Sequence, residues 1–177
     1  MKRTGIFGGS FNPIHNGHIS LALQLKERAR LDEVWLMVSP QNPLKQSNDL
    51  LDDEKRLHMA RLAVEGIEGI TVSDYEMHLP RPSYTWNTLE ALSKDYPERQ
   101  FVLMIGGDNW ALFDKWYRAD DIRQKYEITV YTRTPGDPGF IDLSSTVVRQ
   151  RIHQGKGIRR MVPKAVADYI KENGLYA

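Results

Sequence analysis

The chain of 177 residues contains no cysteine, and this absence excludes several classes of protein at once. Without thiols there is no disulfide framework, no thiolate zinc site and no cysteine nucleophile. Long apolar runs are also missing, since none approaches the roughly 20 residues that span a bilayer. The first residues, Met1 to Phe7, lack the apolar stretch of about 7–15 residues that is typical of a secretory signal. We therefore expect a soluble cytoplasmic protein with no membrane partner.

An excess of charge of either sign is missing as well. The chain has 24 basic and 23 acidic residues, for a net charge of +1. Proteins that coat nucleic acid carry a basic patch or stripe, and none is evident here. Neither an internal repeat nor a low-complexity linker interrupts the chain. These features predict a single domain over residues 1–177, with a helical C-terminal part over about 144–177 and no nucleic-acid partner.

Short apolar, β-rich runs alternate along the chain with segments of helical periodicity. The predicted strands are Thr4–Phe7, Glu33–Val38, Ile70–Val72, Phe101–Ile105 and Glu127–Tyr131. The predicted helices are Gly17–Arg30, Asp53–Glu65 (capped by Asp52 or Asp53), Tyr84–Lys94, Ser145–His153 and Pro163–Glu172. This alternation predicts an α/β fold, a Rossmann-like, doubly wound parallel sheet of about five strands with helices on both faces.

Ligands of such sheets bind beyond the carboxyl ends of the strands, where the strand order reverses. The loop after the first predicted strand, Gly8 to His18, is the richest of these segments. Two glycines, Gly8 and Gly9, allow the backbone to approach a ligand and offer N–H groups to phosphate oxygens. His15 and His18 flank the start of a predicted helix, where anions are favoured. As a pair they can be cationic or can act as hydrogen-bond donors. Half of a metal site is the alternative, but no third ligand is near in sequence.

This loop resembles the His-x-Gly-His signature of the nucleotidylyltransferase superfamily. The match depends on its glycines, Phe11, Pro13, His15 and His18, a combination with a chance frequency on the order of 10⁻⁸ or less. In that superfamily the histidines hold the phosphates of ATP and the α-phosphoryl transition state. The resemblance therefore implies an ATP and phosphate site that includes Gly8, Gly9, Ser10, Phe11, His15 and His18.

A second candidate anion site opens the helix predicted at Ser145. Ser144, Ser145 and Thr146 are consecutive hydroxyl residues, one of which can cap the helix, and Arg149 lies one turn further on. Taken alone, this is what an ordinary capped helix with a surface arginine looks like. Beside the first motif, it resembles the superfamily's Ser-Ser/Thr-x-x-Arg motif, which implies contacts with the β- and γ-phosphates of ATP.

The second substrate is indicated by three segments: Arg81–Leu89, Gly106–Asn109 and Phe113–Tyr117. Together they resemble the bacterial nicotinate-nucleotide adenylyltransferases over nearly the whole chain. The resemblance implies that Trp116 stacks on the pyridine ring, whereas Trp35 and Trp86 are expected in or near the core. It also implies an acceptor site with the following residues: Thr85, Gly106, Asp108, Trp116 and Tyr117.

The chain departs from that family in two places. The loop after the second strand places Lys45 in the family's basic position, but Leu44 stands where a histidine commonly precedes it. The segment Thr134–Asp142 is shorter than its counterpart in relatives. The distal motif that follows is intact.

The reaction implied is transfer of the adenylyl group of ATP to nicotinate mononucleotide, which yields nicotinate adenine dinucleotide and pyrophosphate. The acceptor phosphate is already anionic near neutral pH, so neither a base nor a covalent intermediate is required. The expected catalytic residues are His15, His18, Lys45 and Arg149. Mg²⁺ is expected on the substrate phosphates rather than in a protein metal site.

Three other functions stay open at this point. A transferase of the same superfamily could use phosphopantetheine or the amide mononucleotide. A nucleotide-binding regulator could have kept the fold without the chemistry, although both histidines and Arg149 are present. A nucleic-acid-binding module is disfavoured by the net charge. The sequence also leaves the oligomeric state open, a homo-oligomer included.

Overall fold

The computed structural model describes residues 1–40, 50–132 and 144–177 of the chain. Within these ranges the strands are β1 (Lys2–Gly9), β2 (Glu33–Val38), β3 (Ile70–Ser73), β4 (Arg99–Gly106) and β5 (Glu127–Tyr131). The α-helices are α1 (Asn16–Arg28), α2 (Asp53–Val64), α3 (Thr85–Asp95), α4 (Gly107–Ala111), α5 (Ala119–Lys125), α6 (Ser145–His153) and α7 (Lys164–Glu172). Two 3₁₀ turns, η1 (Tyr75–His78) and η2 (Phe113–Lys115), complete them.

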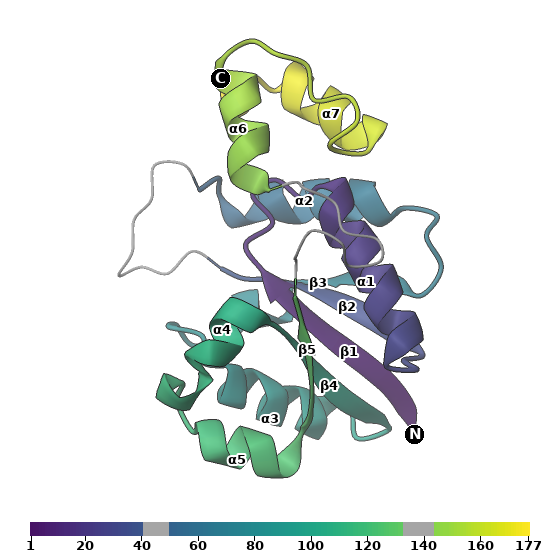
Figure 1. The fold of residues 1–177 in the computed structure, drawn as a ribbon, viewed down its shortest axis with the longest axis vertical. Coiled ribbons are helices and arrows are strands. Elements are labelled where there is room, and N and C mark those ends of the chain that lie inside the picture. Colours follow the sequence, from purple (N-terminus) through teal and green to yellow (C-terminus); the bar gives the residue numbers. More distant parts are fainter. Residues whose placement is uncertain (41–49, 133–143) are drawn as a thin grey trace.

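The strands form one parallel sheet in the order β3-β2-β1-β4-β5 (Figure 1). The central strand β1 pairs with β2 on one side, Phe7 opposite Leu36, and with β4 on the other, Phe7 opposite Met104. The chain runs outward from β1 to β3 and then returns to the opposite side of β1, so the strand order reverses between β1 and β4. The predicted Rossmann-like α/β fold is confirmed, and its reversal point lies at the carboxyl ends of these two strands.

Alternation along the strands builds a separate apolar layer on each face of the sheet. In β2, Leu36 and Val38 belong to the layer beneath α1, α2 and the C-terminal helices, whereas Trp35 and Met37 belong to the layer beneath α3 and α5. Figure 1 shows these two sets of helices on opposite sides of the sheet. Such near-continuous burial is typical of parallel strands that are covered on both faces. The expected core position of Trp35 is confirmed by its exposure of 8%.

Several short elements escaped the sequence prediction. Helix α5 has only two buried residues, Ala119 and Ile122, which is too few to produce a detectable apolar period. The five residues of α4 follow directly after Gly106 and were expected only as a break after the strand. Pro163 is the N-cap of α7 rather than its first-turn residue, a shift of one position.

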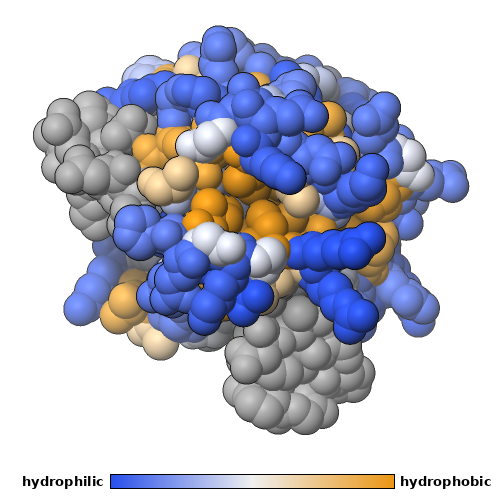
Figure 2. All heavy atoms as spheres, turned by 90° about the horizontal axis from the view of Figure 1, so that it is seen from above, coloured by the Kyte–Doolittle hydropathy of each residue, from blue (hydrophilic) through white to orange (hydrophobic). Residues whose placement is uncertain are grey.

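The C-terminal helices extend the molecule beyond α2, and Val166 and Ile170 of α7 join the layer under α2 (Figure 1). Seen from this end, the surface has an apolar hollow with a hydrophilic border (Figure 2). A cavity of about 770 Å³ in this part is lined by Ile152, Ile158, Leu175 and neighbouring basic residues. None of the helices in the described ranges is both long and apolar enough to cross a membrane.

Candidate active site

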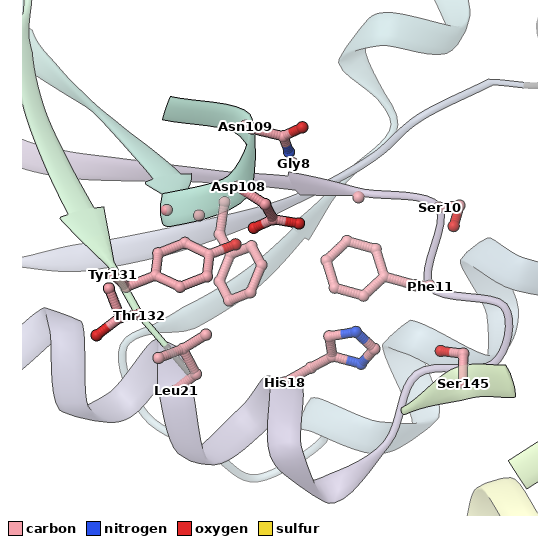
Figure 3. Close-up of a pocket in the computed structure, with 14 residues that line it drawn as sticks. Gly8, Ser10, Phe11, His18, Leu21, Asp108, Asn109, Tyr131, Thr132 and Ser145 are labelled. Atoms are coloured by element: carbon pink, nitrogen blue, oxygen red, sulfur yellow. The ribbon is translucent and has the colours of Figure 1, made fainter. Parts of the chain in front are cut away.

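Two adjoining cavities open at the carboxyl ends of β1 and β4. The larger cavity, of about 760 Å³, is bordered by the loop after β1, the start of α1, the β4–α4 junction and the end of β5 (Figure 3). The smaller cavity, of about 280 Å³, lies toward α3 and η1. Both are lined by Gly8, Gly9, Gly106, Asn109 and Tyr131. Two ligands could therefore meet over the glycines that end these strands.

Glycine at position 8 leaves the shared border of the two cavities open. A Cβ atom placed there would meet no other atom within 4 Å. At Gly106 and Gly107, by contrast, a Cβ would lie 3.2 Å from Asp108 Oδ1 and 3.3 Å from Thr132 Cγ2. The space beside Gly8 is thus available to a ligand that approaches the backbone closely.

Phe11 holds the loop after β1 in an unusual conformation. Its φ of +47° is in the left-handed region, which bulky residues rarely adopt. The side chain is 2% exposed, and its ring packs edge-on against His18 with the centroids 4.9 Å apart. Burial of this ring offsets the backbone strain and places His18 at the wall of the larger cavity.

His15 acts as the N-cap of α1. Its Nδ1 accepts hydrogen bonds from the backbone N–H groups of Gly17 and His18, at 3.1 and 3.3 Å. Its side chain is buried, and it is not among the described residues that line the larger cavity. Histidine is an uncommon N-cap, so this structural use could not be predicted from the residue type.

His18 completes a capping box with His15. Its Nδ1 accepts a bond of 3.1 Å from the His15 backbone N–H, and the two rings stack 3.6 Å apart. A protonated imidazole has two N–H donors and cannot accept at Nδ1. The sequence allowed either a cationic or a hydrogen-bonding pair, and the network selects neutral rings with their protons on Nε2. His18, unlike His15, lines the larger cavity (Figure 3).

The distal motif docks on the loop after β1. Ser144 caps α6 by accepting from Val147 N–H at 3.2 Å. Ser145 Oγ donates to the carbonyl oxygen of Pro13 at 2.8 Å, and Arg149 Nη1 donates to that of Asn12 at 2.8 Å. Two segments more than 130 residues apart are therefore joined at one corner of the site.

Only part of the distal motif reaches the larger cavity in this structure. Ser145 lines it, whereas Thr146 and Arg149 line a neighbouring depression with Leu51 and Tyr176. Arg149 Nη2 also donates to Thr146 Oγ1 at 3.3 Å. Arg159 and Arg160, which follow α6 in the chain, have exposed side chains.

Arg56 is a structural residue of the site that sequence reasoning missed. Its side chain is completely buried, and it donates to the carbonyl oxygens of Leu51, Ser10 and Ser39, each at 2.8 Å. It also pairs with Asp53 at 2.6 Å. The guanidinium thus connects the first residues after β1 and β2, Ser10 and Ser39. A helical arginine normally lies in solvent, and the sequence carries no signal that distinguishes this one.

The smaller cavity brings together three of the predicted acceptor residues, Thr85, Gly106 and Trp116. The Trp116 ring rests on Phe113, with centroids 5.1 Å apart, which leaves its remaining surface to the cavity. Tyr117 is exposed and packs on Tyr84 instead of lining this cavity. Asp108 lines the larger cavity rather than the smaller one, and Gly106 lines both.

Glu76 on η1 is a further residue of the smaller cavity that the sequence did not point to. It lines the cavity together with Ser83 and Thr88, which belong to the segment Arg81–Leu89 that the sequence did indicate. Burial raises the pKa of Glu76 to about 6, although a hydrogen bond of 3.3 Å from Thr88 Oγ1 lowers it in part. The polar residues that follow β3, Asp74 and Glu76, were the one feature of the sequence that could have suggested this position.

Two of the sequence predictions lie outside the described residues. Lys45, expected to be catalytic, and the substituted Leu44 fall in residues 41–49. The shortened segment Thr134–Asp142 falls in residues 133–143. A group of three or more histidine, aspartate or glutamate residues that could hold a metal ion is absent from the described ranges.

The chain is similar to known proteins over most of its length. Residues 6–151 match the cytidylyltransferase-like family. The chain is 48% identical to a probable nicotinate-nucleotide adenylyltransferase of Bacteroides fragilis, over 93% of this chain and 89% of that protein. It is 37% identical to a protein of the same description from Bacillus pumilus, over 99% of each.

Solved structures lead to the same fold. A putative nicotinate-nucleotide adenylyltransferase from Vibrio parahaemolyticus superposes with a TM-score of 0.79 at 27% identity, over 99% of this chain and 96% of that one. The nicotinic acid mononucleotide adenylyltransferase of Plasmodium falciparum, complexed with NaAD, superposes with a TM-score of 0.78 at 18% identity, over 99% and 98%.

Proposed function

Because this chain belongs to the cytidylyltransferase-like family, and within it to the nicotinate-nucleotide adenylyltransferases, we propose that it joins ATP to nicotinate mononucleotide in NAD biosynthesis. The observation that carries this proposal is the pair of adjoining cavities at the strand reversal point, which share Gly8, Gly9 and Gly106. One cavity has the imidazole of His18 and the other has the indole of Trp116.

ATP is assigned to the larger cavity. His18 and the open backbone at Gly8 and Gly9 would contact its phosphates through N–H groups. Ser145 extends this set, and Arg149 would contact the distal phosphates after it leaves its bond to Asn12. Lys45 keeps its predicted role as a further cation. His15 would act chiefly by capping α1 and thereby positioning His18.

Nicotinate mononucleotide is assigned to the smaller cavity. Trp116 would stack on the pyridine ring, and the first turn of α3 at Thr85 would offer N–H groups to the ring carboxylate. Backbone groups near Tyr117 keep their predicted part in holding that carboxylate. Asp108 and Gly106, at the border of the cavities, would contact the ribose or the nucleotide on the side of ATP.

The chemical step is a direct displacement at the α-phosphorus of ATP. A phosphate oxygen of nicotinate mononucleotide forms the new bond to phosphorus, and the bond to the β-phosphate oxygen breaks, which releases pyrophosphate. His18 would donate a hydrogen bond to the α-phosphoryl oxygens as charge builds on them. Positioning of the two substrates in adjoining cavities would supply a further part of the rate enhancement.

The residues of the larger cavity fit a magnesium ion that is held mainly by the substrate. Asp108 is the one carboxylate among the described residues that line it, and Mg²⁺ prefers one or two carboxylates together with phosphate oxygens and water. When bound there, the ion would neutralise phosphate charge.

Pyrophosphate release from ATP with a panel of acceptors tests the proposal. The panel holds nicotinate mononucleotide, nicotinamide mononucleotide and phosphopantetheine, and we expect nicotinate mononucleotide to be the preferred acceptor. Absence of turnover with both pyridine nucleotides would refute the proposed reaction, and preference for phosphopantetheine would reassign the acceptor.

Trp116→Ala tests the assignment of the cavities. Loss of a stacking partner is worth about 1–3 kcal/mol, so the KM for nicotinate mononucleotide should rise about tenfold while that for ATP stays unchanged. Trp110→Ala is the matched control, because Trp110 also stacks on Phe113 but is not among the described residues that line either cavity. Equal weakening of both substrates in Trp116→Ala would contradict the stacking role.

A further inference from the structure

The smaller cavity contains a carboxyl group that the proposed reaction does not use. Glu76 is the one carboxylic acid among its described lining residues, and lysine, arginine and histidine are absent from that same set. The ligand assigned to this cavity carries a carboxylate on its pyridine ring. An ionised Glu76 would therefore face a like charge with no described cation beside it.

No described cation forms an ion pair with the Glu76 carboxylate. Asp74, the N-cap of η1, contacts His78 and lies 3.9 Å from Arg61, and Tyr75 on η1 hydrogen-bonds to Asp95. From α3, the neutral hydroxyl of Thr88 donates to it, and from β5 the phenol of Tyr131 lines the same cavity. The packed strand β2 contributes Ser39 after its end, while its charged residue Glu33 binds Arg99 elsewhere.

Ser83 adds an unsatisfied group to the same cavity. Its Oγ is buried and has no hydrogen-bond partner among the described residues. A buried hydroxyl without a partner is unfavourable, and a ligand oxygen in the cavity would satisfy it. Glu76, Ser83 and Thr88 are thus polar groups in a cavity whose other walls include Ile6, Leu89 and Trp116.

We propose that Glu76 and Ser83 form the polar end of the acceptor cavity, and that an acidic acceptor binds with Glu76 protonated and donating a hydrogen bond. This inference rests on the proposed function and adds a specificity-determining residue to it. Binding of the acid would then take up a proton from solvent onto Glu76. The raised pKa of Glu76, about 6, keeps the protonated form accessible near neutral pH.

Nicotinamide mononucleotide, which carries a neutral carboxamide on its ring, would not require Glu76 to be protonated. A carboxamide has N–H donors, so an ionised Glu76 can accept from it without taking up a proton. The preference for acid over amide should therefore decrease as the pH rises above 6. The phosphates of the two nucleotides titrate alike, so their effect cancels in the ratio.

Calorimetry measures the proton directly. Nicotinate mononucleotide is titrated into the enzyme at pH 7 in buffers of different ionisation enthalpy, and we expect an uptake of at least about half a proton. Glu76→Gln, which stays neutral and keeps donors, should lose this uptake. In Glu68→Gln, a matched loss of one exposed carboxylate, the uptake should be retained. Equal uptake in the parent and Glu76→Gln would overturn the proposal.

Kinetics provides a second readout. In the parent, the KM for nicotinate mononucleotide should rise by up to about tenfold per pH unit above pH 6, whereas in Glu76→Gln it should stay nearly flat. Ser83→Ala should raise this KM at every pH without a change of slope. A slope that is the same in the parent and Glu76→Gln would contradict a role for Glu76.

Thr88→Val keeps the inference testable if Glu76→Gln does not fold. Thr88 lowers the pKa of Glu76, so its loss should move the rise in KM to higher pH, and an unmoved profile would count against the proposal. Absence of adenylyl transfer at every pH would refute the proposed function itself. Transfer with a pH-independent ratio of acid to amide would refute only the part played by Glu76.

Discussion

The two histidines of the first loop perform different tasks although they are three residues apart. His15 is buried and uses Nδ1 to cap α1, while His18 lines the larger cavity. Since both rings accept a backbone N–H at Nδ1, neither is an imidazolium in this structure. A contribution to phosphoryl transfer would therefore come from a directed N–H group and not from a full positive charge.

Replacement of His18 should lower kcat. Removal of one donor to a developing charge typically costs about 10²-fold or more in rate, so we expect that decrease in His18→Ala. His18→Gln is the informative partner, because glutamine at this helix position can still accept from the His15 N–H and retain the capping box. Steady-state kinetics measure the loss of the hydrogen-bond donor, and thermal unfolding measures the loss of the capping box. A kcat within threefold of the parent in both variants would remove His18 from the mechanism.

Gly8→Ala should obstruct substrate and leave the fold intact. Its added methyl would meet no protein atom within 4 Å and would occupy the border of the two cavities. We expect the free energy of unfolding to change by less than about 0.5 kcal/mol and KM values to rise markedly.

Gly5→Ala is the reverse case, because its methyl would lie 2.6 Å from Leu31 Cδ1 and 2.8 Å from Met104 Sδ. It should lose about 1–3 kcal/mol of stability through overpacking, with normal KM values for the folded enzyme. Unchanged kinetics in Gly8→Ala would show that no ligand approaches that glycine.

At the scale of elements, α2 holds together the segments that border the site. Its residue Arg56 donates to the carbonyl oxygens of Ser10, directly after β1, and Ser39, directly after β2. Asp53 pairs with Arg56 and also with Arg81 near the start of α3, at 2.9 Å. One turn of this helix therefore connects the elements that border both cavities.

Arg56→Met should destabilise the protein by about 3 kcal/mol or more, because it leaves buried carbonyl groups and Asp53 without their donor. Urea unfolding measures the change. Arg61→Met is the control on the same helix, since Arg61 is exposed and lies 3.9 Å from Asp74. That variant should stay within about 0.5 kcal/mol of the parent. Similar losses in the two variants would mean that the buried bonds of Arg56 contribute little.

At the scale of the whole molecule, the two ends of the sheet differ, one in forming the cavities and the other in joining the strands. The carboxyl ends hold the cavities, whereas the amino ends are joined by an ion pair network. There Glu33 on β2 accepts from Thr4 of β1 and from Arg99 of β4, each at 2.8 Å. Three adjacent strands are thus fixed at the end remote from the site.

The Glu33 network predicts a stability that depends on pH. Burial raises the pKa of Glu33, but hydrogen bonds from Arg99 and Thr4 and the charges of Arg99 and Lys2 outweigh it, so the pKa is below the ordinary 4.5. A lowered pKa stabilises the folded state above pH 4.5, and this contribution is lost as the pH falls through the folded-state value. Glu33→Gln should therefore be less stable than the parent at pH 7, by about 1 kcal/mol.

Urea unfolding at pH 7 and below pH 4 checks this difference, which should shrink in acid. Glu98→Gln is the control, because Glu98 also pairs with Arg99 but is largely exposed. It should show little difference at either pH. A deficit of Glu33→Gln that is constant with pH would indicate lost packing instead of a lost charge.

Much of the architecture was predictable because strands and long helices carry their own periodicity. The apolar run of β2 was predicted with the observed bounds, and α2 with a cap at Asp52 or Asp53, of which the structure has Asp52. Short elements such as α5 were missed, because seven residues with two buried positions contain too little pattern. The first loop was recognisable for a similar reason, since its glycines and histidines all lie within the eleven residues from Gly8 to His18.

By itself, then, the sequence determined the parallel α/β fold and the family, and it pointed to the loop after β1 as the candidate ligand site. Only the tertiary structure decided which polar atoms are engaged within the protein and which line the cavities. In the folded chain, His15 Nδ1 caps a helix, Ser145 donates to Pro13, Arg56 is buried between two loops, and Glu76 lines a cavity. The physical reason is range: periodicity and loop motifs are local, whereas hydrogen bonding and desolvation depend on groups that folding brings together from distant segments.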